Sequence, residues 1–81
     1  MKRESIPIAS IYVPTKRRAT LDPDTVQALA QNIMDVGQQM PILVRPDGDR
    51  FVLVEGLHRL EAAKELGEKT IIGLLVQARK K

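Results

Sequence analysis

The sequence predicts a single small α+β domain with the element order β-α-β-β-α-β. The chain has 81 residues, which suffice for one hydrophobic core but not for two. Hydrophobic residues make up 43% and charged residues 28%, a balance typical of a folded domain. Short apolar runs alternate with two segments of helical spacing. We expect the domain to cover residues 6–76, with residues 1–5 and 77–81 as basic, flexible ends.

The first strand is predicted over residues 6–13. Its apolar residues are Ile6, Ile8, Ile11 and Val13. Pro7 cannot donate a hydrogen bond to a neighbouring strand, which favours an edge position, and Pro14 ends the strand. A basic loop over residues 15–20 should follow.

The first helix is predicted to begin after Asp22 and to end at Gly37. Asp22 is the expected N-cap, Pro23 suits the first helical position, and Asp24 places an acid in the first turn. Gly37 is a typical C-terminal stop. The apolar face at helical spacing comprises Val26, Leu29, Ala30, Ile33 and Met34.

Two strands at 41–45 and 50–54 should form a hairpin around the turn-forming residues 46–49. Asp47 and Asp49 are expected to shape this turn, because no other carboxylate or histidine lies near them in sequence. No metal site is therefore predicted.

The second helix is predicted over residues 58–66 and should end at Gly67. An apolar run over residues 70–76 supplies the last strand. The chain contains no internal repeat and no low-complexity segment.

Composition excludes several kinds of site. The absence of cysteine rules out disulfides, thiolate metal sites and thiol nucleophiles. Tyr12 and Phe51 are the only aromatic residues, too few for stacking a series of bases. No apolar run approaches the ~20 residues of a membrane span, so we expect a cytoplasmic protein that does not bind membranes.

The formal net charge is +3, and basic residues gather near the two ends of the chain, at residues 2–3, 16–18 and 79–81. Such clusters favour polyanions such as nucleic acids or nucleotides through counterion release. Solvated, solubilising ends are the alternative interpretation.

The segment Glu55-Gly56-Leu57-His58-Arg59 joins an apolar strand to the second helix. Two basic side chains at a helix N-terminus oppose the helix dipole unless an anion completes the site. Gly56 allows close approach, the N–H groups of residues 57–59 point out of the helix, and Arg59 can hold oxygens bidentately. These features predict a phosphate site.

A structural alternative stays open for the same segment. Gly56 can be an ordinary turn residue, Arg59 can pair with Glu55 or with a neighbouring acid, and His58 can cap the surface.

Over residues 6–76 the sequence resembles the ParB/sulfiredoxin superfamily. The matching segments are Ile-Pro-Ile-Ala-Ser-Ile at 6–11, Leu-Asp-Pro-Asp-Thr-Val-Gln-Ala-Leu at 21–29, Pro-Ile-Leu-Val-Arg at 41–45 and Phe-Val-Leu-Val-Glu-Gly-Leu-His-Arg-Leu-Glu-Ala-Ala at 51–63. The resemblance implies that the strand-glycine-helix segment holds the phosphates of ATP, as in sulfiredoxins, or of CTP, as in ParB proteins.

The resemblance carries over residue by residue. Gly56, His58 and Arg59 match the sulfiredoxin motif Gly-Cys-His-Arg, and Gly56 and Arg59 match the ParB motif Gly-Glu-Arg-Arg. Leu57 matches neither motif, and leucine offers no nucleophile for sulfinic acid reduction. The implied phosphate-binding residues are Gly56, Leu57, His58, Arg59, Arg17 and Arg18, and the implied base-side contacts are Gln38, Gln39, Met40 and Pro41.

The function implied is a nucleotide-binding regulatory or DNA-associated module of plasmid or chromosome partition, with ATP or CTP as ligand and Mg²⁺ as a companion ion. The helices that follow this domain in ParB proteins are not in the sequence, so we expect non-specific DNA contact at most. A homodimer or a partner protein also fits. One alternative is a phosphate-transferring enzyme or nuclease, for which Glu55 and His58 are the only acid-base pair; another is nucleotide-independent DNA binding.

Overall fold

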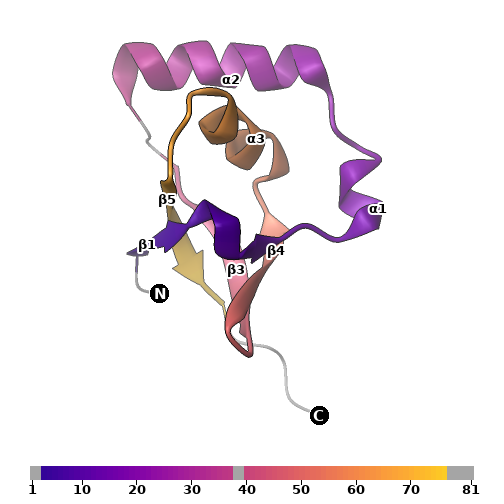
Figure 1. The fold of residues 1–81 in the computed structure, drawn as a ribbon. Helices are drawn as coiled ribbons and strands as arrows, with labels where there is room; N and C mark the ends of the chain where they lie inside the picture. The colour runs from indigo at the N-terminus through magenta and orange to yellow at the C-terminus, as the bar shows by residue number, and fades with distance from the viewer. Residues whose placement is uncertain (1–2, 38–39, 77–81) are drawn as a thin grey trace.

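The computed structural model describes residues 3–37 and 40–76, without the side chain of Arg17. Its elements are β1 (Arg3–Pro7), the 3-10 turn η1 (Ile8–Ser10), β2 (Ile11–Tyr12), α1 (Thr15–Arg18), α2 (Pro23–Val36), β3 (Ile42–Asp47), β4 (Arg50–Glu55), α3 (Leu57–Glu65) and β5 (Thr70–Leu75). The five strands form one mixed sheet in the order β1-β5-β3-β4-β2. Figure 1 shows α3 between this sheet and α2, so the predicted α+β class is confirmed.

The predicted first strand is divided into two strands at opposite edges of the sheet. β1 pairs antiparallel with β5, whereas β2 pairs parallel with β4. Between them, η1 turns the chain and the amide of Ile8 donates to the carbonyl of Lys69 at 3.0 Å. Only the three residues of η1 join these two edge strands, and in Figure 1 this segment crosses in front of the other strands. Pro7 lies in an edge strand, as predicted, and β1 includes residues 3–5, which were expected in a flexible end.

The first predicted helix is confirmed as α2, with both of its expected ends. The carboxylate of Asp22 accepts from the amide of Asp24 at 3.1 Å, and Pro23 occupies the first turn. Gly37 follows the helix at a φ of 82° and donates its amide to Ile33 at 2.7 Å. The basic loop predicted at 15–20 is instead partly helical, because Arg18 donates to the carbonyl of Pro14 and closes the single turn of α1.

The predicted hairpin is formed by β3 and β4, with a shorter connection than expected. Asp47 pairs with Arg50 in the ladder, so Gly48 and Asp49 alone make the turn. Gly48 has a φ of 64°, which a glycine adopts without strain. The guanidinium of Arg50 forms an ion pair with Asp47 at 3.1 Å and lies 4.5 Å from the ring centroid of Tyr12.

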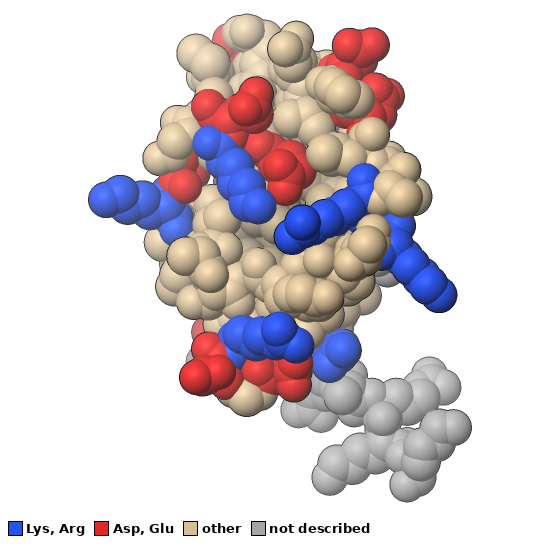
Figure 2. All heavy atoms as spheres, turned by 45° about the vertical axis from the view of Figure 1, so that its right-hand side comes forward, with Lys and Arg blue, Asp and Glu red and all other residues tan. Residues whose placement is uncertain are grey.

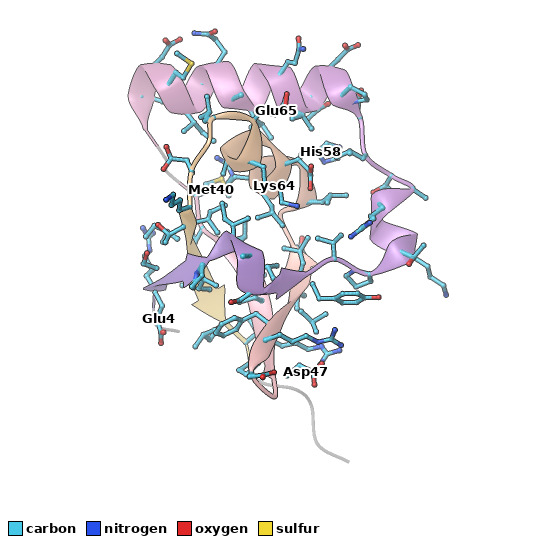
Figure 3. All side chains as sticks on the ribbon, in the orientation of Figure 1. Glu4, Met40, Asp47, His58, Lys64 and Glu65 are labelled. Carbon is cyan, nitrogen blue, oxygen red and sulfur yellow. The ribbon has the colours of Figure 1, made fainter. Side chains whose placement is uncertain are left out.

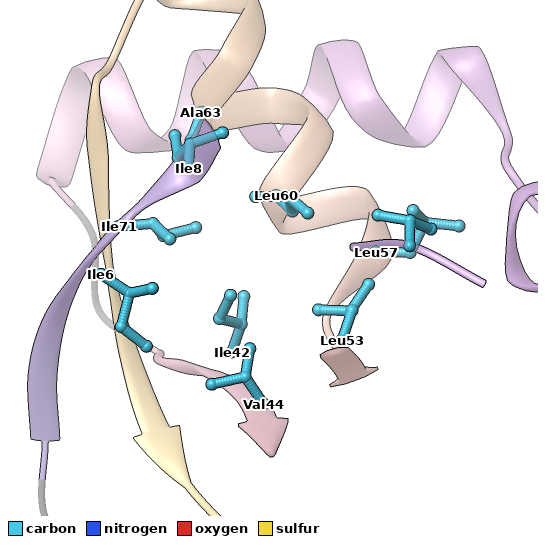
Figure 4. Packing of buried hydrophobic residues seen from close by; sticks show 10 residues of the cluster. Ile6, Ile8, Ile42, Val44, Leu53, Leu57, Leu60, Ala63 and Ile71 are labelled. Carbon is cyan, nitrogen blue, oxygen red and sulfur yellow. The ribbon is translucent and has the colours of Figure 1, made fainter. Parts of the chain in front are cut away.

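The main core lies between the sheet and α3 (Figure 4). Its most deeply buried side chains are Ile6, Ile42, Leu53, Leu60, Ile71 and Val44. On the opposite side of α3, Ala62 packs with Val26 and Ile33 of α2 in a second cluster. The helix α3, whose N-cap is Gly56, is therefore buried on two sides, which fixes its N-terminus relative to the sheet.

Candidate functional site

Gly56 forms the corner between β4 and α3. Its φ of 107° lies in the left-handed region, and a β-carbon there would lie 2.6 Å from Cγ2 of Ile42. No larger residue fits this conformation and this space without strain. The carbonyl of Gly56 accepts from Leu60 at 2.9 Å, which begins the helix and leaves the first-turn N–H groups without helical acceptors.

A cavity of about 380 Å³ lies beside this corner. Its lining residues are Met40, Pro41, Leu43, Glu55, Gly56, Arg59 and Leu74. The structure thus brings Gly56 and Arg59, from the expected phosphate side, together with Met40 and Pro41, from the expected base side. Gln38 and Gln39 lie outside the described residues.

The cavity also contains residues that the sequence interpretation missed. Leu43 on β3 and Leu74 on β5 give it an apolar wall and are neighbours in the parallel ladder. The burial pattern of β3 explains this, since Ile42 and Val44 are buried in the core and Leu43 alternates with them. The alternation of side chains along β3 could have predicted from the sequence that Leu43 faces away from the core. Placing Leu43 in the cavity also required knowing that β3 pairs with β5.

Other expected site residues lie outside the cavity lining. Leu57 is only 7% exposed and belongs to the main core, so that it can offer an anion only its backbone amide. Arg18 is exposed on α1 and does not line the cavity, and the side chain of Arg17 is not described.

His58 has a partner that the sequence did not indicate. Its Nε2 accepts a hydrogen bond from the backbone N–H of Asp22 at 2.9 Å. In Figure 3 the imidazole extends from α3 toward the connection between α1 and α2. No sequence signal pointed to this contact, because the two residues are 36 positions apart.

The alternative in which Arg59 pairs with Glu55 is not formed. Within residues 3–37 and 40–76, the ion pairs are Asp47–Arg50 and Glu61–Lys64. Glu55 and His58, both among the described residues, form no hydrogen bond with each other, and Nε2 of His58 accepts from the amide of Asp22. Arg59 thus lines the cavity, and no carboxylate of the described residues lies within ion-pair distance of it.

Asp22 joins several groups at the start of α2. The Thr25 hydroxyl donates to Oδ2 at 2.8 Å and holds the pKa of this carboxyl below its ordinary value, aided by the hydrogen bond from the Asp24 amide. Across the face seen in Figure 2, Lys and Arg side chains are interspersed with Asp and Glu and do not form one continuous basic patch.

No group of three potential metal-ligating side chains occurs among the described residues. None of the helices in this part of the chain is long and apolar enough to span a membrane.

The fold and the corner define a small α+β domain of the ParB/sulfiredoxin type, with an arginine-lined cavity where β4 meets α3. The chain belongs to the ParB N-terminal domain family, whose model matches residues 2–81. This finding confirms the resemblance that the sequence motifs indicated.

Curated relatives are chromosome-partitioning proteins. The chain is 34% identical over 62 residues to the probable chromosome-partitioning protein ParB of Campylobacter jejuni, which covers 76% of this chain and 22% of that protein. It is 38% identical over 63 residues to the chromosome-partitioning protein Spo0J of Thermus thermophilus, and this match covers 76% of this chain and 23% of that protein. The matches thus span less than a quarter of each of these relatives.

Two solved structures are similar over nearly the whole chain. Sulfiredoxin from Arabidopsis thaliana superposes with a TM-score of 0.86 at 28% identity, covering 96% of this chain and 88% of that one. A C-terminally truncated ParB from Caulobacter crescentus, complexed with CTP-gamma-S, superposes with a TM-score of 0.83 at 26% identity, covering 99% and 47%.

Proposed function

We propose that this domain binds the phosphates of ATP or CTP at the corner between β4 and α3. It would act as a regulatory or DNA-associated module in plasmid or chromosome partition. The observation that carries the proposal is the cavity of about 380 Å³, which combines Arg59 and Gly56 with the loop residues Met40 and Pro41. Its volume lies within the usual range for small-molecule sites.

The two sides of the cavity suit the two ends of a nucleotide. Arg59 and the first-turn amides of α3 favour phosphate oxygens. The helix dipole and the charge-assisted hydrogen bonds of the Arg59 guanidinium would act on the same anion. Leu43 and Leu74 offer an apolar surface for the base. The ParB relative complexed with CTP-gamma-S supports CTP. ATP rests on the resemblance of Gly56, His58 and Arg59 to the sulfiredoxin phosphate motif.

The carboxylate of Glu55 lines the cavity. Mg²⁺ is commonly held by one or two carboxylates together with substrate phosphates, so Glu55 fits this ion when a nucleotide brings it. The ion would neutralise phosphate charge beside Arg59.

Sulfinic acid reduction is not proposed, because Leu57 stands where the sulfiredoxin motif has cysteine and the chain contains no thiol. Phosphate transfer is not proposed, because His58, the histidine of the only acid-base pair considered, is engaged through Nε2 by the amide of Asp22. A binding role therefore accounts for the corner with fewer groups than a catalytic role.

Titration with ATP, CTP, ADP and GTP, each with and without Mg²⁺, tests the proposal. We expect saturable amide shifts at Gly56, Leu57, His58 and Arg59, with a dissociation constant between about 1 μM and 1 mM. If no triphosphate produces saturable shifts at these amides in low salt, the proposed function is overturned.

A further inference from the structure

The hydrogen bond between Asp22 and His58 connects two parts of the candidate site. His58 belongs to the first turn of α3, at the phosphate side, and Asp22 ends the segment that contains α1. The donor is a backbone N–H and the acceptor is Nε2, separated by 2.9 Å. A side chain thus holds the backbone of another segment.

This geometry fixes the chemical state of the imidazole. A nitrogen that accepts a hydrogen bond carries no proton, so the ring is neutral and its single proton is on Nδ1. Nε2 is then unable to donate to a phosphate while the bond persists.

The bond also restrains the residues that precede Asp22. The amide of Leu21 donates to the carbonyl of Arg18 at 3.2 Å, which closes the turn between α1 and α2. On the other side, the carboxylate of Asp22 caps α2 through Asp24 and Thr25. Holding Asp22 therefore holds the C-terminal end of α1 and the first turn of α2 together.

We propose that His58 is a positioning residue, which places α1 and its exposed Arg18 relative to the corner at Gly56 and does not bind phosphate through Nε2. The inference rests on the proposed nucleotide site for its functional consequence. Its structural part, the neutral Nδ1–H tautomer bonded to Asp22, holds without nucleotide.

The structural part is tested in the free protein. Imidazole ¹⁵N shifts should report a proton on Nδ1 and none on Nε2. In His58→Leu, the amides of Asp22 and Leu21 should exchange with solvent about two- to tenfold faster than in the parent, as expected for one lost hydrogen bond. In His58→Gln, whose amide oxygen can accept the same bond, Asp22 and Leu21 should regain their protection. A proton on Nε2, or unchanged exchange in His58→Leu, would overturn the inference.

A double-mutant cycle with Arg18→Ala tests the functional part. If His58 acts by placing Arg18 near the bound nucleotide, Arg18→Ala itself weakens nucleotide binding. His58→Leu then weakens binding about two- to tenfold in the parent and has little further effect in Arg18→Ala. If His58 contacts phosphate directly, its effect persists in the Arg18→Ala background, and the positioning role is overturned. Absence of nucleotide binding by the parent would reject the proposed function and this consequence of it, while the tautomer and exchange results would still decide whether the bond exists.

Discussion

Gly56 and Ile42 approach each other so closely that a β-carbon at position 56 would clash with Ile42. The contact joins the start of α3 to the first residue of β3, and its closest approach involves the side chain of Ile42. The corner of the candidate site is thus part of the core packing.

Gly56→Ala should lower the free energy of unfolding by about 2–5 kcal/mol, through backbone strain at positive φ and overpacking against Ile42. Gly67→Ala is the matched control, because Gly67 has a φ of 75° and nothing within 4 Å of an added β-carbon. It should cost about 1–2 kcal/mol, the strain alone. Urea unfolding measures the free energy of unfolding of both variants. Equal losses in the two would contradict the steric contact between position 56 and Ile42.

Arg59→Ala should weaken triphosphate binding by about 1.5–3 kcal/mol, the range for a hydrogen bond to a charged group. Arg50→Ala is the control, since it removes the same charge at the opposite end of β4. Isothermal titration at low salt compares them. Equal weakening in both variants would indicate diffuse attraction rather than a specific contact.

Titration of Asp22 should make the free energy of unfolding depend on pH. Its folded pKa is lowered, so its ionised form contributes stability that is complete above the ordinary value of 3.8 and is lost as pH falls through the lowered folded pKa. Asp22→Asn retains a capping side chain but has no charge to titrate. The stability difference between the two proteins should therefore shrink below pH 3.8 in urea unfolding. A difference that stays constant down to pH 2 would argue against this role.

Leu57→Cys should react slowly with thiol reagents, because the side chain at position 57 is 7% exposed. Met40→Cys, at a position that is 63% exposed, is the control. The parent chain has no cysteine, so each variant carries one thiol. Comparable labelling rates in the native state would show that residue 57 faces the site rather than the core.

Elements with a local signal were predictable from the sequence. Asp22, Pro23 and Gly37 mark the ends of α2, and each acts on backbone groups within four residues. The hairpin of β3 and β4 likewise depends on a two-residue connection.

Features set by distant partners were not predictable in this way. The split of residues 3–12 into β1 and β2 depends on separate partners, β5 and β4, which occur much later in the chain. For the site, the motif indicated Gly56 and Arg59, whereas Leu43, Leu74 and the bond from Asp22 to His58 required the assembled sheet and helices.

The pairing of β1 with β5 affects the order in which this domain folds. Arg3 lies opposite Leu74, so almost the whole domain separates two strands that are neighbours in the sheet. Contacts of such long sequence separation slow folding, because loop-closure entropy is lost before the contacts form. During synthesis, β1 has no strand to pair with until β5 has left the ribosome. We therefore expect α2, β3, β4 and α3 to assemble first, with the N-terminal strand added last.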